Sequence, residues 1–360
     1  MKFGQVSEAK AYSFINARIK ARKGQLLTAA DYEQLLSSSL TEGLTYLRDK
    51  SRYLDSFTNL DLKSTDFPIK LERLLHENIY NETNTLLNDT PKKARMLIQF
   101  YFKKYYIDAL KQIIRLIHTN EIGTLSLEDL FIPTIEEKTE LSVILQSESI
   151  VDLIHKLQAP WAVEALESVI HEYAKQKNVI LLENALDQAY YKYLWYNIIP
   201  SQHKRDRKVA KKIIGTKIDL ININIVLRSK LLNFSIDEIL PQLIPIKYRL
   251  TDALNQAIKA LSFSEANESL QTTIYSDLIR AIYRDYREKE KTIVKIEQLQ
   301  QEWFIQTLFT ILAGYPFHIG TFLAYIVFRL QETENLRIIF ETKWKGIDIK
   351  FAREQLIYFK

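Results

Sequence analysis

The sequence contains no cysteine and few residues that break helices. Among its 360 residues there are eight glycines and eight prolines. Without cysteine, a disulfide, a thiolate metal site and a cysteine nucleophile are all excluded. Sheet-rich folds with many tight turns normally use more glycine and proline, so their scarcity indicates a helical protein.

Glycine is also too scattered to build a phosphate-binding loop. Neither G-x-x-x-x-G-K-[ST] nor G-x-G-x-x-G occurs, and Gly215-Thr216-Lys217 is only a fragment of the first pattern. These loops hold phosphate through closely spaced backbone N–H groups, which require the glycines. We therefore expect no nucleotide site of the ordinary type and no catalysis that depends on one.

What the chain does contain is typical of a globular protein. Apolar residues make up 47% of it and charged residues 26%, with a net charge of +5. This length accommodates two or three domains, and the modest positive charge permits an anionic partner without requiring one. Residues 1–23 are basic and polar with no apolar stretch, so we expect no signal peptide.

A nine-residue helical pattern occurs three times at a constant interval. The copies begin at residues 109, 222 and 335, so successive copies are 113 residues apart. In each copy apolar residues recur at i, i+3 and i+4, which places them on one face of a helix; they are Leu110/Ile113/Ile114, Ile223/Val226/Leu227 and Leu336/Ile339/Phe340. A triplicated unit follows from this regular spacing.

The surrounding sequence repeats in the same order. A proline precedes each copy at a similar distance, at Pro91, Pro200 and Pro316. Proline cannot continue a helix interior, so each unit is expected to break before its repeated helix. We predict an all-α fold of three similar segments, at residues 1–133, 134–245 and 246–360, which share a central cavity. They are called the first, second and third segments below.

Residues that could carry catalysis or bind a metal are present but are not suitably spaced. No two of the six histidines are three or four residues apart; they are His76, His118, His155, His171, His203 and His318. The neighbouring acids Glu136-Glu137 and Asp237-Glu238 point about 100° apart on a helix, so they do not form a catalytic pair by spacing. We predict no catalytic, cofactor-binding or metal-ligating residue, although a metal site assembled from distant histidines is left open.

Two stretches suggest contact with other molecules. The basic run His203–Lys212 lacks the interleaved aromatic residues of a single-strand binder, so a solvated helix face is the simplest interpretation and a partner or lipid-headgroup contact is the alternative. Residues 303–328 contain no charged residue and are long enough to cross a bilayer. Because Gly314, Pro316 and Gly320 interrupt this stretch, and the other two copies carry charges at the same place, we predict two packed helices that do not span a membrane.

Matching placement of charges between the copies suggests internal ion pairs. Glu72, Glu183 and Glu297 occupy matching places, as do Arg115 and Arg228. We predict that each glutamate pairs with the arginine of its own segment, as Glu72–Arg115 and Glu183–Arg228, because an unpaired buried charge is costly. In the third segment Lys343 or Arg337 would take the place of the arginine. Exposed charges on amphipathic helices are the alternative.

Three motifs resemble a known family. They are Tyr12-x-x-x-Asn16-Ala17-Arg18 followed by Leu26-Leu27, then Asp219-x-x-Asn222-x-x-x-x-Leu227-Arg228-x-Lys230, and Glu334-Asn335-Leu336-Arg337-Ile338. Together with the triplication they make the whole chain similar to the C subunit of archaeal A-type ATP synthases, which corresponds to the d subunit of V-type ATPases. The first copy departs from the pattern with Ala109 in place of asparagine, and the third with Phe340-Glu341-Thr342.

The resemblance implies a mechanical role. In that family three helical units form a pseudo-threefold funnel that receives the D and F subunits of the central stalk and rests on the membrane ring of proteolipid subunits. The protein transmits torque during proton or sodium transport and ATP synthesis, and it is not a catalyst. The expected protein is peripheral at the cytoplasmic face of the membrane, touches the membrane only through the ring, and has no cofactor, small-molecule substrate or nucleic-acid partner. The alternative is a helical module that binds nucleic acid or protein through Lys204–Lys212.

Overall fold

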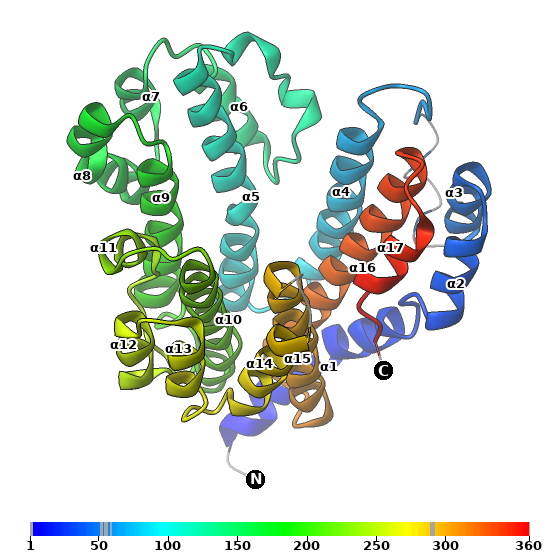
Figure 1. Ribbon diagram of the computed structural model, residues 1–360. Helices are drawn as coiled ribbons and strands as arrows, with labels where there is room; N and C mark the ends of the chain where they lie inside the picture. The colour runs from blue at the N-terminus through cyan, green and yellow to red at the C-terminus, as the bar shows by residue number, and fades with distance from the viewer. Residues whose placement is uncertain (1–2, 51–52, 54–56, 58–59, 289–291, 360) are drawn as a thin grey trace. The chain divides into compact units, whose positions relative to one another are not determined.

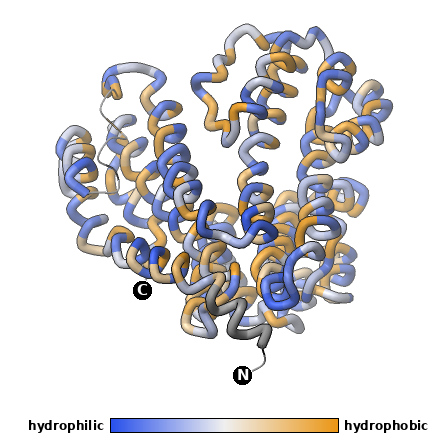
Figure 2. The backbone as a smooth tube through the Cα atoms, turned by 180° about the vertical axis from the view of Figure 1, so that it is seen from behind, coloured by the Kyte–Doolittle hydropathy of each residue, from blue (hydrophilic) through white to orange (hydrophobic). Residues whose placement is uncertain are grey.

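The computed structural model describes residues 3–50, 53, 57, 60–288 and 292–359. Every regular element in these residues is a helix, and no strand occurs among them (Figure 1). The predicted all-α class is therefore confirmed. Along the described helices hydrophobic and hydrophilic residues alternate over short distances, as amphipathic helices require (Figure 2).

Contacts divide the chain into two compact units that do not follow the sequence order. The first compact unit comprises Met1–Arg95, Ser126–Pro133 and Leu308–Lys360, and the second comprises Met96–Leu125 and Thr134–Thr307. Two helices, α5 (Lys92–Thr119) and α15 (Thr292–Ala313), contribute to both. The three segments predicted from the repeats are a division by sequence, and their boundaries stay a prediction.

The first compact unit is built from both ends of the chain. Besides parts of α5 and α15, its elements are α1 (Phe3–Lys23), α2 (Ala29–Ser37), α3 (Leu40–Asp49), α4 (Phe67–Leu87), the short 3-10 helix η2 (Leu127–Asp129), α16 (Gly320–Trp344) and α17 (Ile349–Gln355). Local sequence signals start the small helices. Thr28 caps α2 through a capping box with Asp31, and Ser39 caps α3 in the same way with Glu42.

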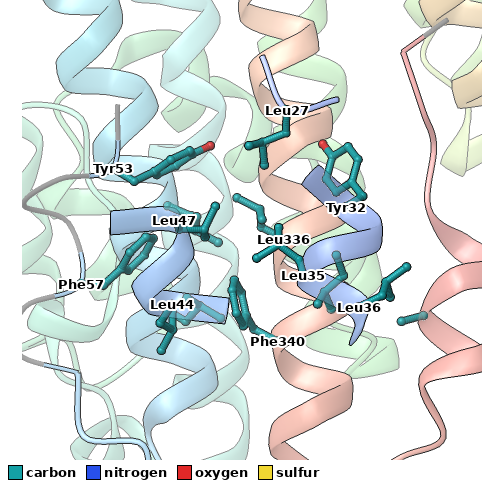
Figure 3. Packing of buried hydrophobic residues seen from close by; sticks show 14 of the residues in the cluster. Leu27, Tyr32, Leu35, Leu36, Leu44, Leu47, Tyr53, Phe57, Leu336 and Phe340 are labelled. Atoms are coloured by element: carbon teal, nitrogen blue, oxygen red, sulfur yellow. The ribbon is translucent and has the colours of Figure 1, made fainter. Parts of the chain in front are cut away.

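The core of the first compact unit forms around the third copy of the repeated helix. Leu336 and Phe340 of α16 are fully buried and lie between apolar side chains of α2 and of α3 (Figure 3). The apolar face that the i, i+3, i+4 pattern predicted is thus the face that packs. Each buried leucine or phenylalanine of this kind stabilises the fold by about 1.5–3 kcal/mol.

The uncharged stretch 303–328 forms two helices rather than one. Helix α15 ends at Ala313 and α16 begins at Gly320, and every residue from Gly320 to Phe328 is buried. The two helices pack together through the rings of Phe309 and Phe328, whose centroids are 4.8 Å apart. The prediction of two packed helices is confirmed. Within the described residues, no helix is both long and apolar enough to cross a bilayer.

The second compact unit holds the first and second copies of the repeated helix. Besides the remaining parts of α5 and α15, its elements are η1 (Ile122–Thr124), α6 (Ile135–Ile144), α7 (Ile150–Lys156), α8 (Pro160–Gln176), α9 (Ile180–Tyr193), the π-helical turn η3 (Leu194–Ile198), α10 (Lys204–Leu231), α11 (Ile236–Ile239), η4 (Leu240–Gln242), α12 (Thr251–Lys259), α13 (Phe263–Leu270) and α14 (Ser276–Glu288). The apolar faces of the copies in α5 and α10 are fully buried, as predicted.

Candidate functional site

In the second and third copies, the asparagine of the repeated pattern binds the backbone near the end of its own segment. In α10 the Asn222 side chain donates to the carbonyl of Ile244 at 2.9 Å and accepts from its N–H at 2.9 Å. In α16 Asn335 makes the same pair of bonds with Ile357, at 2.8 and 3.1 Å. Both partners are 22 residues further along the chain. The repeated asparagine is therefore a clamp, which Ala109 of the first copy cannot form.

A buried acid three residues before each asparagine binds the start of the next segment. In α10 the Asp219 carboxylate accepts from the N–H groups of Tyr248 and Arg249 at 3.0 and 2.6 Å, and from the hydroxyl of Tyr275 at 2.8 Å. Burial raises the pKa of Asp219 despite these donors. The Tyr248 ring lies so close to Gly215 that a Cβ there would be 2.5 Å from it. Glycine is thus required for this approach.

The third copy repeats the arrangement with a glutamate. Glu332 in α16 accepts from the N–H of Leu27 at 2.6 Å and from the hydroxyl of Tyr53 at 2.6 Å. Leu27 lies in the loop between α1 and α2, so the third segment is joined to the first in the same way as the second is joined to the third. Glu332 is 0% exposed, so this carboxylate depends entirely on its protein partners.

A lysine near the end of the repeated helix caps a helix of the next segment. Lys230 Nζ donates to the carbonyl of Ile258 in the last turn of α12 at 2.8 Å. Lys343 Nζ donates to the carbonyls of Leu36 and Ser38 at the end of α2. Cations are favourable at helix C-termini because the last carbonyls have no partner within the helix. Burial lowers the pKa of both lysines.

The pairing of glutamates with arginines differs from the sequence-based prediction. Arg115 binds Glu183 through two bonds of 2.5 and 2.8 Å, and Arg228 binds Glu297 at 2.5 Å. The predicted pairs Glu72–Arg115 and Glu183–Arg228 are therefore wrong: each arginine binds the glutamate of the following segment. The cause is packing, because the copy in α5 lies against α9 of the second segment and the copy in α10 lies against α15 of the third. These side chains are partly exposed, so each pair stabilises the fold by only about 0–1 kcal/mol.

The substitute predicted for the third segment is also wrong. Glu297 is paired with Arg228, and Arg337 pairs with Glu334 at 2.5 Å and Glu341 at 2.9 Å on its own helix. Lys343 caps α2, as described above. Residues three and four apart are neighbours on a helix surface, so Arg337 finds both partners without any tertiary contact.

A buried ionic network that the sequence did not suggest fastens α16 to α4. Arg329, which is 1% exposed, donates to Glu82 at 2.8 Å, to Asn78 at 2.7 Å and to the hydroxyl of Tyr53 at 2.7 Å. It also forms an ion pair with Glu332, one helical turn away. The sequence signal is that Arg329 is the first charged residue after a long uncharged run.

The hollow and the basic run of the second compact unit are separate features. A groove of about 430 Å³ has α8 and α9 as its main walls, and its charged lining residues are Glu164 and Lys192. In the part of the chain that the structure describes, no group of three His, Asp or Glu side chains is placed to hold a metal ion. The run Lys204–Lys212 forms the beginning of α10, and its exposed residues are Lys204, Arg207, Lys208 and Lys212.

Comparison with known proteins decides the family. A model of the ATP synthase (C/AC39) subunit family matches residues 15–355. The chain belongs to this family. Among curated relatives, the C subunit of the A-type ATP synthase of Methanosphaera stadtmanae is 25% identical, over 95% of this chain and 86% of its own length. The C subunit of Methanosarcina mazei is 26% identical over 96% of this chain and 92% of its own length. The C subunit of Methanocaldococcus jannaschii is 24% identical over 98% of this chain and 88% of its own length. The family resemblance inferred from the motifs is confirmed.

In this C/AC39 family member the N-terminal motif residues are also structural. Asn16 in α1 donates to the carbonyl of Pro316 at 2.5 Å, which holds the turn between α15 and α16. Arg18 forms an ion pair with Asp89, just after α4, and donates to the carbonyl of Thr85 in the last turn of α4 at 3.2 Å. The motifs on which the resemblance rests therefore fix neighbouring helices within each compact unit.

One lysine of the second compact unit is held in an unfavourable environment. Lys217 of α10 is half-buried, with Nζ 5.5 Å from the ring centroid of Phe304 and 3.4 Å from the side-chain oxygen of Gln301. Burial and the like charge of Lys104 lower the pKa of Lys217 to about 8, and Glu297 opposes this shift. Lys104 and Lys217 occupy matching positions, five residues before the first and second copies and 113 residues apart.

Replacing Lys217 by methionine is expected to stabilise the protein near pH 7. The folded state binds this proton less tightly than the unfolded state does, so stability rises with pH from about 8 towards the ordinary lysine value of 10.5. One pKa unit corresponds to about 1.4 kcal/mol, and partial exposure reduces the effect, so we expect a gain of about 1–2 kcal/mol. Urea denaturation of Lys217→Met at pH 7 and in this alkaline window measures both the gain and the loss of pH dependence.

Lys104→Met is the matched control for this measurement. This variant removes the like charge but leaves the surroundings of Lys217 otherwise unchanged. The free energy of unfolding should therefore rise by less than in Lys217→Met, and the pH range over which stability changes should only become narrower. If Lys217→Met were destabilised, or kept the full rise of stability with pH, burial of the ammonium group would not be the cause of the pH dependence.

Proposed function

We propose that this protein is a non-catalytic central-stalk adaptor of a rotary A-type or V-type ATPase. In this role it couples the D and F subunits of the stalk to the proteolipid ring of the membrane, and it is peripheral at the cytoplasmic face. The observation that carries the proposal is the family match over residues 15–355. The relatives are named as C subunits of A-type ATP synthases, and the chain covers most of their length.

Each repeated helix contacts a helix of another segment. The repeated helix of the first segment, α5, contacts α9 of the second through Arg115–Glu183 and through the stacked rings of Phe100 and Tyr190. The repeated helix of the second, α10, contacts α15 of the third through Arg228–Glu297. That of the third, α16, packs on α4 of the first. On the strength of the family match, we propose that the three segments form the funnel that receives the stalk.

The polar positions of the repeated helices suit a part that transmits torque. Such a part must resist shear between its segments, and buried hydrogen-bonded groups resist it because separating them leaves unsatisfied polar atoms. Asp219, Glu332, Lys230 and Lys343 each bind a segment other than their own. We propose that they give the adaptor its stiffness.

Co-purification tests the proposal directly. The full chain with an affinity tag, produced together with stalk and ring subunits, is expected to retain the D and F subunits and the ring after washing. Alone, it is expected to hydrolyse no ATP and to show no micromolar binding of Mg-ATP by calorimetry, because no phosphate-cradling loop is present. Loss of the stalk subunits from the purified complex, or ATP turnover by the isolated chain, would contradict the proposed function.

A further inference from the structure

The start of α10 presents a face composed entirely of cations. Lys204, Arg207, Lys208, Lys211 and Lys212 fall within an arc of about 140° and a length of about 12 Å, from 3.6 residues per turn and a 1.5 Å rise. Lys211 is half-buried and the other four are exposed. We call these five residues the α10 basic face. Its charge density is much higher than the net charge of the chain would suggest.

Folding alone does not account for the basic face. Among the described residues, none of the five cations forms an ion pair with an acidic side chain of this protein. Asp206, the acid within the run, is buried on the opposite side of the helix together with Ala210, Ile213 and Ile214. The cations also stand at the positive end of the helix dipole, where anions are favoured. These charges therefore lack an internal counterpart and fit an anionic partner.

An aromatic residue borders the basic face. The centroid of the Trp195 ring lies 5.6 Å from Lys211 Nζ. The next residue, Tyr196, is 61% exposed and lines the α8–α9 groove together with Lys192 of α9. Tryptophan beside lysine is typical of surfaces at the membrane–water interface, where the ring lies at headgroup depth. Protein interfaces instead favour arginine and are depleted in lysine, whereas four of the five cations here are lysines.

We propose that the α10 basic face, together with Trp195, binds the anionic phospholipid headgroups of a membrane surface. A cluster of this size on one helix matches the polybasic surfaces that bind acidic lipids. The contact is direct and is additional to contact through the proteolipid ring. It rests on its own observations, so failure of the lipid contact and failure of the adaptor role are separate results.

Vesicle flotation with the full chain tests this contact. We expect the protein to float with phosphatidylcholine vesicles that contain phosphatidylglycerol, and not with phosphatidylcholine alone. Added salt should weaken the binding, because it screens exposed charges. Each cation near an anionic surface contributes about fivefold to the binding constant, so Lys204→Gln, Arg207→Gln and Lys208→Gln combined should weaken it about 100-fold. All three side chains are exposed, so the variant should fold, which circular dichroism checks.

The matched control neutralises three exposed lysines elsewhere. Lys175→Gln, Lys259→Gln and Lys350→Gln combined remove the same net charge and should leave vesicle binding within about twofold, since long-range screening weakens distant charges. Equal loss in both variants would overturn the proposal in favour of net charge alone. Equal binding to neutral vesicles would also overturn it, as would binding to duplex DNA as strong as to phosphatidylglycerol at the same salt. The variant with the neutralised basic face should still co-purify with stalk and ring subunits.

Discussion

Replacing Arg329 by leucine is expected to lower the free energy of unfolding by about 3–5 kcal/mol, the largest single effect predicted for this chain. The guanidinium is buried and binds Glu82, Asn78, Tyr53 and Glu332. Without it, the carboxylate of Glu332 would stay at 0% exposure with no cation beside it. Urea denaturation followed by circular dichroism measures the loss.

A double variant separates the charge imbalance from the lost packing. Arg329→Leu combined with Glu332→Leu removes both members of the most buried pair, while Glu82 keeps Arg22 at 3.9 Å. Because breaking a buried pair costs more than replacing it whole, the double variant should be more stable than Arg329→Leu alone. Lys350→Leu, an exposed cation, should change stability by less than about 0.5 kcal/mol. A loss below about 1 kcal/mol for Arg329→Leu would show that the network contributes little.

Replacing Asn222 by alanine is expected to lower the free energy of unfolding by about 2–4 kcal/mol. The substitution leaves the N–H of Ile244 and the carbonyls of Ile244 and Ile246 without their side-chain partner. Each unsatisfied buried group costs about 1–3 kcal/mol. Alanine fits a repeated helix at this place, as Ala109 of the first copy shows, so steric effects do not confuse the result. Chemical denaturation gives the loss directly.

Two further variants test whether the loss of stability comes from the hydrogen bonds of the repeated asparagine. Asn335→Ala breaks the equivalent pair of bonds to Ile357 and should cost a similar amount. Asn255→Ala removes an exposed asparagine of α12 and should stay within about 0.5 kcal/mol of the parent. If Asn222→Ala were as mild as Asn255→Ala, the repeated asparagine would not be a clamp, and another reason for its repetition would be needed.

The local features of this protein were determined by the sequence. The helical class, the buried faces of the three repeated helices and the cap at Thr28 follow from residue spacing, because a helix places i, i+3 and i+4 on one side wherever it packs. The break within residues 303–328 was likewise predictable from glycine and proline. Family membership followed from motifs spread over the whole chain.

The partners of the charged and polar side chains were decided only by the tertiary structure. Periodicity indicates that Arg115 and Glu183 lie on helix surfaces, but it cannot show which helices become neighbours, so the predicted pairing within segments was wrong. The clamp at Asn222, the network of Arg329 and the lowered pKa of Lys217 arise from the same cause. Each depends on groups distant in sequence, and the free energy of a buried polar group is set by the atoms around it.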